Sequence, residues 1–304
     1  MKKIWSGILY ALLWTLALLP MRVLYLFSDI SYLLVYRVAR YRLKVVRQNL
    51  RRSFPEKNNA ELHAIERKFY RYLCDLLFEA LHMLHMSERQ MVRHIKFENP
   101  EVLENYALEG RNVYAVFGHY GNWEWICSLP LQLRPDLMSV STLYKTLHDS
   151  ALDSFYLRLR SHFGTHCYPN KQVLRGIVDL KSMGKPFVMA FIADQTPSLV
   201  HTHYWTTFLH QDTAFITGWE TLARKHNAPV IFLQMKRVKR GYYTCHFIPI
   251  CDQPKDAAPN SLIEAYAHLM EQNIQENPAF WLWSHRRWKH RRPISEEKTA
   301  EKTE

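Results

Sequence analysis

The sequence has few cysteines, and none of them is arranged for a disulfide framework or a metal-binding knuckle. There are five, an odd number without any C-x-x-C pair, at positions 74, 127, 167, 245 and 251. Small secreted domains and zinc knuckles need paired cysteines at regular spacings. The cysteines therefore favour a reducing compartment, and we expect no structural metal.

Two other patterns are missing. The chain has no G-x-S-x-G sequence, so the strand–turn–helix that carries a nucleophilic serine in many hydrolases is not expected. It also has no internal repeat and no low-complexity linker, and its 304 residues suffice for one large domain or two small ones. Only the tail at residues 294–304 has the composition of a disordered segment.

A long uncharged stretch occurs only at the N-terminus. Residues 4–20, IWSGILYALLWTLALLP, carry no charge and are flanked by two lysines and an arginine. About 17 apolar residues is the lower limit for a membrane span. The sequence around Pro20 lacks the small residues of a signal-peptide cleavage site, and two tryptophans suit a membrane interface. We therefore predict a membrane anchor helix at residues 1–21, with a buried helix of a soluble protein as the alternative.

Negative charge is scarce relative to positive charge. The chain has 40 Lys and Arg against 28 Asp and Glu, a formal net charge of +12, which implies acidic partners such as nucleic acid, anionic lipid or an acidic protein. Five basic residues repeat at steps of three and four beside an apolar stripe: Arg37, Arg40, Lys44, Arg47 and Arg51. On one helix they would face anionic headgroups, or simply solvent. Residues 22–100 are thus predicted to be helical, basic and close to a membrane.

After Gly110, short apolar runs alternate with amphipathic stretches. Five strands are predicted, at residues 112–117, 137–143, 187–193, 229–235 and 242–250. Five helices are predicted between and after them, at residues 123–133, 150–163, 173–183, 213–227 and 260–276. Such alternation is typical of an α/β fold, so we predict a mixed sheet flanked by helices over residues 101–293.

Residues 113–125, VYAVFGHYGNWEW, contain the strongest candidate for catalysis. The apolar run ends at Gly118, His119 follows it, and Glu124 comes five residues later. Side chains at such strand ends are exposed on a rigid backbone. We expect Glu124 to orient the imidazole of His119 so that it can take a proton from a substrate hydroxyl. The alternative is that His119 has only a structural role, with its hydrogen bonds satisfied at a strand–helix junction.

The turn between these two residues has further candidates. Asn122 is expected to cap the N-terminus of the helix that follows. Backbone N–H groups around Gly121 and Trp123 are candidates to bind a developing oxyanion.

Other polar residues are candidates for substrate binding. Asp194 follows a predicted strand directly, although turn-capping aspartates are common there. Arg158, Arg160 and Arg175 lie in helix-like segments, where they would either bind phosphate or face solvent.

Residues 279–293 combine aromatic residues with a dense basic run that includes Arg286 and Arg287. Nucleic-acid contact, packing at a membrane interface, and docking of an acidic carrier protein or a lipid phosphate all fit this composition. Because the run continues from apolar residues 280–283, it is expected to be ordered, and a flexible nucleic-acid arm is disfavoured.

Several motifs occur together in one order along the chain. They are NLRRSFPE, FGHYGNWEW, YKTLHDSALDSFYLRLRSHFG, LRGIV, FIADQTP, FLHQDTAFITGWETLARKHNAPV and WLWSHRRWKHRRP. FGHYGNWEW resembles the H-x4-D/E motif of the glycerolipid acyltransferase superfamily. The whole set is similar to the bacterial lipid A biosynthesis acyltransferases, the late lauroyl and myristoyl transferases, and extends over residues 20–293.

The resemblance implies a glycerolipid-acyltransferase-like fold behind a membrane anchor, on the cytoplasmic face of the bacterial inner membrane. It also implies an acyl thioester donor on acyl carrier protein and a lipid A precursor as acceptor. The family's catalytic His and Glu match His119 and Glu124. Its functional Arg and Asp match Arg160 and Asp194, with Arg158 as a competing match for the first. Residues 150–153 depart from the Asn-Pro pair of many relatives.

The resulting hypothesis is a membrane-associated O-acyltransferase that needs no cofactor, no metal and no covalent acyl-enzyme. The basic composition suits an acidic carrier protein, a phosphorylated acceptor and an anionic membrane. The substrate-binding candidates are the residues introduced above: Arg158, Arg160, Arg175, Asp194, Gly121, Asn122, Arg286 and Arg287. We expect a monomer that does not bind nucleic acid. The alternatives are an acyl thioester or ester hydrolase on the same fold and a non-enzymatic, membrane-tethered binder of anionic lipid or nucleic acid.

Overall fold

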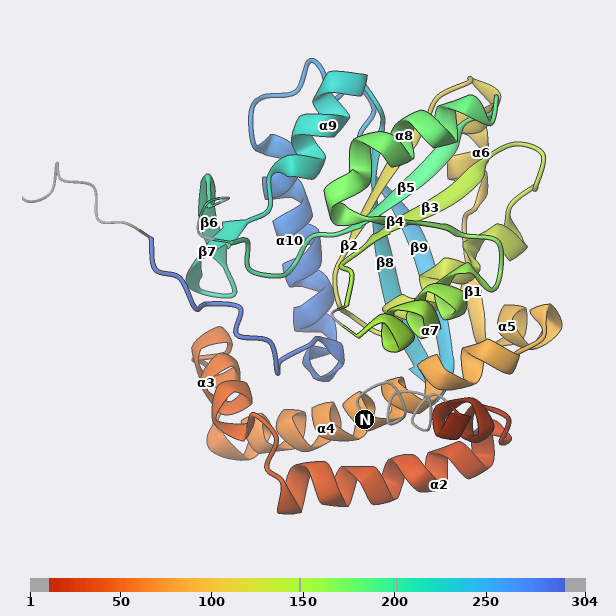
Figure 1. The fold of residues 1–304 in the computed structure, drawn as a ribbon. Coiled ribbons are helices and arrows are strands. Elements are labelled where there is room, and N and C mark those ends of the chain that lie inside the picture. The colour runs from red at the N-terminus through yellow and green to blue at the C-terminus, as the bar shows by residue number, and fades with distance from the viewer. Residues whose placement is uncertain (1–10, 148, 199, 201, 293–304) are drawn as a thin grey trace, which may run out of the picture.

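A seven-stranded sheet organises the chain in the computed structural model, which describes residues 11–147, 149–198, 200 and 202–292. The strand order is β1-β9-β8-β2-β5-β3-β4 (Figure 1). All neighbouring pairs are parallel except β8 and β9, which form an antiparallel hairpin. The strands are β1 (Ile95–Phe97), β2 (Val113–Phe117), β3 (Ser139–Tyr144), β4 (His166–Pro169), β5 (Phe187–Ile192), β8 (Val230–Lys239) and β9 (Tyr242–Cys251).

All five predicted strands are present, and the predicted mixed α/β fold is confirmed. β2 and β5 lie in the middle of the sheet, and each is an almost uninterrupted run of buried residues. Strands covered by helices on both faces need apolar side chains on both faces, which explains the lack of alternation. β1 and β4 have three and four residues, too short for a recognisable period.

Helices cover both faces of the sheet (Figure 1). They are α5 (Glu88–His94), α6 (Glu101–Leu108), α7 (Ser150–Ser161), α8 (Val173–Ser182), α9 (Gly218–His226) and α10 (Ser261–Glu276). The helix predicted at residues 123–133 is a 3₁₀ segment, Trp123–Gln132, with Pro130 inside it. Proline removes a backbone donor, so a regular α-helix is disfavoured there.

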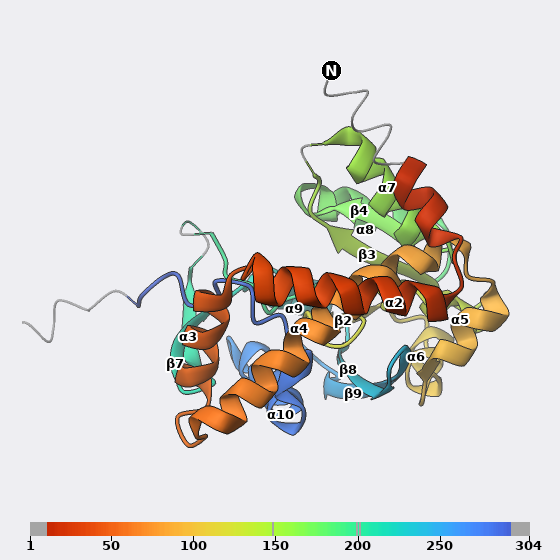
Figure 2. The same ribbon diagram turned by 90° about the horizontal axis from the view of Figure 1, so that it is seen from below.

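A long helix, α4 (Asn59–His82), crosses the carboxyl ends of the central strands (Figure 1). Asn58 and Glu61 form a capping box at its N-terminus, which fixes where the helix begins. α2 (Met21–Tyr32) packs along α4, as seen from below in Figure 2. α4 thus separates α2 from the edge of the sheet where parallel strands present their terminal side chains.

The basic stripe predicted over residues 37–51 does not form one helical face. The chain passes from α2 into a π-helical turn (Leu33–Val38) and begins α3 (Leu43–Ser53) only after a break. Arg40 and Arg42 have φ angles of 48° and 50° within that break, so the helical period is interrupted. Arg47 is not a free surface cation, because it binds Glu66 at 2.8 Å.

Part of the predicted anchor packs against the protein. Residues 1–10 lie outside the described residues, and residues 11–17 are helical. Ala17 is fully buried, its carbonyl lies 3.2 Å from Nδ1 of His82, and Trp14 contacts the ring of His85 edge-on. Among the described residues, no helix combines the length and the apolar character that crossing a bilayer requires.

The helix predicted at residues 213–227 is present but begins later, as α9 (Gly218–His226). Residues 213–215 belong instead to a separate hairpin of β6 (Tyr204–Phe208) and β7 (Gln211–Phe215). Leu209 and His210, both with positive φ, make the turn of this hairpin. The C-terminal segment at residues 281–292 runs beside the hairpin and α3 (Figure 1). The predicted disordered tail at residues 294–304 lies outside the described residues.

Candidate active site

His119 and Asp194 meet at the carboxyl edge of the sheet. His119 follows β2 and Asp194 follows β5, and these strands are adjacent and parallel. Nδ1 of His119 lies 2.7 Å from Oδ1 of Asp194, and the backbone N–H of His119 donates to Oδ2 at 2.8 Å. The carboxyl ends of neighbouring parallel strands present side chains at one edge, where open α/β sheets bind ligands.

Asp194 is buried and held by three donors. The third is the indole N–H of Trp281, which donates to Oδ2 at 2.7 Å. Burial alone would raise the pKa of Asp194, but the charge and hydrogen bonds of His119 and the bond from Trp281 hold that pKa below its ordinary value. The carboxyl group is therefore ionised at neutral pH and only accepts hydrogen bonds.

This arrangement sets the tautomer of His119. An ionised carboxylate cannot donate, so Nδ1 must carry a hydrogen, and in the neutral imidazole the lone pair is therefore on Nε2. Gln195 supports the same assignment, because its side-chain nitrogen lies 3.1 Å from Nε2 and can donate to it. The ring of Trp123 contacts the imidazole edge-on, with 5.0 Å between centroids. His119 thus presents a basic nitrogen on a partly exposed side chain, 16% accessible.

The expectation that Glu124 orients His119 is wrong for this structure. Glu124 faces Arg160 of α7 and forms two parallel hydrogen bonds with its guanidinium, of 2.7 and 2.8 Å. Burial would lower the pKa of Arg160, but the Glu124 carboxylate outweighs this effect and raises it. The H-x4-E spacing places Glu124 near His119, but the carboxylate that accepts the Nδ1–H of His119 is Asp194, at the end of β5.

The three candidate arginines have different environments. Arg160 is the arginine that pairs with Glu124 at the site. Arg158 is exposed on α7, with its guanidinium over the ring of Trp14 at 5.9 Å. Arg175 lies on the exposed side of α8, 4.0 Å from Asp179. The structure therefore places Arg160, and not Arg158, beside the H-x4-E turn.

The turn residues do not act as predicted. Asn122 makes no helix cap, because its side chain is buried and donates to Glu79 of α4 at 2.9 Å. The N–H of Gly121 donates to the carbonyl of Phe280, and its own carbonyl accepts from Tyr72. Gly121 also has a φ of +58°, which favours glycine. An oxyanion cannot use the Gly121 N–H in this conformation.

Two backbone donors remain in the turn. Within the described part of the chain, the N–H groups of Trp123 and Glu124 have no acceptor, since both precede the first hydrogen bond of the 3₁₀ segment. Helix N-termini of this kind favour negative charge.

The C-terminal basic run is an ordered wall of the site. Asn49 of α3 donates to the carbonyls of Trp283 and His285, which fixes this segment against the NLRRSFPE motif. Arg286 is exposed, whereas Arg287 is only 1% accessible and donates to the carbonyl of Ala214. The prediction that both arginines dock substrate is thus wrong for Arg287, which is covered by the β6–β7 hairpin.

Three residues at the site were missed from the sequence. Gln195 contacts His119, Trp281 contacts Asp194, and His285 accepts a hydrogen bond from the N–H of Thr196. Burial lowers the pKa of His285 to about 4, so it is neutral at physiological pH. Gln195 sits next to Asp194 in the FIADQTP motif, and that proximity was the available signal.

The fold and the site define a class of protein: an α/β protein with a histidine–carboxylate pair at the carboxyl edge of its sheet. The sequence profile of the bacterial lipid A biosynthesis acyltransferases matches residues 1–290, so the chain belongs to that family. It is therefore an acyltransferase of lipid A biosynthesis, with a lipid A precursor as acceptor, and the resemblance drawn from the motifs is confirmed. A comparison with curated proteins gives no match.

Proposed function

We propose that the protein transfers a fatty acyl chain from an acyl carrier protein thioester to a hydroxyl of a lipid A precursor, with His119 as general base. The observation that carries this proposal is the hydrogen bond from Nδ1 of His119 to Asp194, which puts the lone pair of the neutral imidazole on Nε2, where it can accept the hydroxyl proton. As the hydroxyl oxygen attacks the thioester carbonyl, the imidazole becomes positively charged. The ionised Asp194 stabilises that charge.

Gln195 occupies the proton-accepting nitrogen in this structure. A substrate hydroxyl must take its place, and the amide side chain can move aside because it is only half-buried. In this proposal Gln195 holds the imidazole ring in its orientation between turnovers. It contributes positioning and is not itself a base.

The tetrahedral intermediate needs donors for its oxyanion. We assign this role to the N–H groups of Trp123 and Glu124, at the start of the 3₁₀ segment. The Glu124–Arg160 pair then acts as a brace that fixes these donors, because it joins the segment to α7 through two charge-assisted hydrogen bonds. The collapse of the intermediate expels the thiolate, which receives the proton held by His119.

The donor and the location are part of the proposal. The formal charge of +12 favours an acidic carrier protein, and it favours association with the anionic cytoplasmic face of the inner membrane. The N-terminal segment that begins with residues 1–10 is proposed to contribute to that association.

Acyl transfer by purified protein tests this function. The reaction contains radiolabelled acyl carrier protein thioester and a lipid A precursor, and we expect His119→Ala to lower kcat by about 100-fold or more. His246→Ala is the matched control, because the His246 side chain on β9 is 45% accessible and lies outside the site.

Two outcomes would argue against the proposal. Wild-type turnover by folded His119→Ala would exclude His119 as the base. Release of free fatty acid at the same rate without acceptor would favour a hydrolase on this fold.

A further inference from the structure

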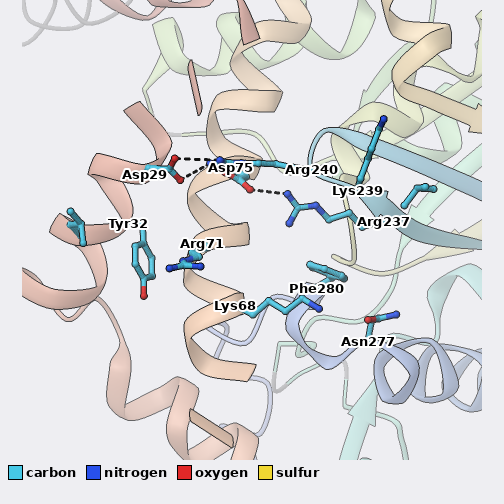
Figure 3. A pocket seen from close by; sticks show the side chains of 12 residues that line it. Asp29, Tyr32, Lys68, Arg71, Asp75, Arg237, Lys239, Arg240, Asn277 and Phe280 are labelled. Atoms are coloured by element: carbon cyan, nitrogen blue, oxygen red, sulfur yellow. Dashed lines mark hydrogen bonds and ion pairs between the residues drawn. The ribbon is translucent and has the colours of Figure 1, made fainter. Parts of the chain in front are cut away.

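A cavity of about 870 Å³ lies between α2, α4 and the end of the β8–β9 hairpin (Figure 3). It is open to solvent and is lined by α2 and the π-helical turn, by α4, by the end of the β8–β9 hairpin and by the segment after α10. None of His119, Asp194, Glu124 and Arg160 lines it. Phe280 forms one wall, and its backbone carbonyl accepts the Gly121 N–H, so the cavity and the catalytic turn share that residue.

Positive charge dominates the lining. Five cations and two carboxylates face the cavity, a formal excess of +3: Lys68, Arg71, Arg237, Lys239 and Arg240 against Asp29 and Asp75. Both carboxylates are already engaged. Asp75 binds Arg237 at 2.7 Å and Arg240 at 2.6 Å, and Asp29 binds Arg240 at 2.7 Å. Arg237 and Arg240 are thereby neutralised, and the excess charge belongs to the other three cations.

The three remaining cations have only aromatic partners among the described residues. Lys68 lies over the ring of Phe280 at 4.9 Å, Arg71 over Tyr32 at 5.2 Å, and Lys239 over Tyr242 at 4.2 Å. Contacts of this kind orient a cation without using all of its hydrogen-bond donors.

One buried donor in the lining also lacks an acceptor. The side chain of Arg237 is only 10% accessible, yet its Nε has no hydrogen-bond acceptor within the described chain. An unpaired buried donor costs free energy, which an anion beside it would offset. The cavity is thus lined by donors and lacks acceptors to match them.

One rim of the cavity is apolar and exposed. Leu33 lines the cavity and is 54% accessible. It continues a row of exposed apolar side chains on the same segment, Leu26, Phe27, Ile30 and Leu34. A contiguous apolar surface beside basic residues is typical of a segment that lies in a membrane interface. A ligand with an anionic head and an apolar tail fits both parts.

We propose that this cavity binds the phosphate of an anionic membrane phospholipid, while the exposed face of α2 and the following turn rests among the acyl chains. Lys68 and Arg71, three residues apart on α4, contact the phosphate oxygens, and Leu33 marks where the lipid leaves the cavity. The site docks the protein on the bilayer beside its catalytic edge. It stands independently of the proposed acyl transfer, because it uses none of the catalytic residues.

Co-sedimentation with vesicles tests the site, using full-length protein and Lys68→Gln/Arg71→Gln. Two cations near a membrane surface contribute about 1 kcal/mol each, so binding to phosphatidylcholine vesicles containing phosphatidylglycerol should fall about 30-fold. Lys181→Gln/Lys225→Gln removes the same charge from exposed positions on α8 and α9, away from α2 (Figure 1), and should bind like wild type. Melting temperatures verify that each variant is folded.

Two further experiments distinguish binding of a phospholipid from binding of a free anion. Leu33→Ser should weaken binding to the same vesicles, and inorganic phosphate alone should neither raise the melting temperature of wild type nor compete with vesicles at millimolar concentration. Equal losses in both double variants would reduce the site to general surface charge. Stabilisation by inorganic phosphate that is lost in Lys68→Gln/Arg71→Gln would make it a free-phosphate site, and either result overturns the proposal.

Discussion

Replacing Asp194 with asparagine separates the two carboxylates that compete for the role of partner to His119. In the wild type, Oδ2 accepts the backbone N–H of His119 and the indole N–H of Trp281, while Oδ1 accepts Nδ1–H. The asparagine side chain has a single oxygen, and this oxygen accepts the larger number of hydrogen bonds when it takes the position of Oδ2. Its amide nitrogen would then face Nδ1 and donate to it, which moves the imidazole hydrogen to Nε2.

The expected loss follows from that change of tautomer. An imidazole with hydrogen on Nε2 cannot take the proton of the attacking hydroxyl. General-base catalysis contributes about 100- to 10,000-fold, so kcat should fall within this range, or about 3–5 kcal/mol in the activation free energy. KM should change little, since the substitution leaves the size of the side chain and the surface of the site unaltered.

Steady-state acyl transfer with purified Asp194→Asn measures the effect, and a thermal melt verifies the fold. Asp179→Asn on α8 is the matched control, because it makes the same chemical change on a side chain that is 47% accessible. Near wild-type kcat in folded Asp194→Asn, together with a loss of 100-fold or more in Glu124→Gln, would refute the reasoning. That pair of results would return the role of partner to Glu124.

Three other substitutions have distinct expected outcomes. Glu124→Gln should cost about 3 kcal/mol in the free energy of unfolding, because it leaves the partly buried Arg160 without a counter-charge. Adding Arg160→Met should restore part of that stability in a denaturant titration but not the activity. Arg287→Glu should give insoluble protein, since it buries an unpaired carboxylate. Arg286→Glu should instead yield folded protein with a raised KM, and the difference in KM between this variant and wild type should shrink at high salt. Burial lowers the pKa of His285 to about 4, so the folded state binds fewer protons than the unfolded state. The protein therefore loses stability as pH falls from about 6.5 to 4. The melting temperature of His285→Gln should fall less over this interval.

The sequence located the site because the pattern there is local. An apolar run followed by Gly118 and His119 predicts a strand end, and the run before Asp194 predicts another. The pairing of His119 with Asp194 depends on β2 and β5 being neighbours in the sheet, although 69 residues separate Phe117 from Phe187. Strand order is a tertiary property, and proximity in sequence favoured Glu124 instead.

The errors elsewhere share a physical cause. The spacing of basic residues over 37–51 assumes an unbroken helix, and the left-handed residues Arg40 and Arg42 interrupt it without any glycine or proline as a signal. The burial of Arg287 depends on the β6–β7 hairpin, whose second strand continues into residues with helical spacing. A basic run in a sequence does not reveal which of its side chains another segment covers.

The most direct test of the central claim is mass spectrometry of lipid A from cells in which the gene encodes His119→Ala. We predict that this lipid A lacks the mass of one acyl chain, as in cells without the protein, and that the wild-type gene restores it. The variant must accumulate in these cells to the wild-type level. Lipid A of unchanged mass in such cells would contradict the assignment of His119 as the base for acyl transfer.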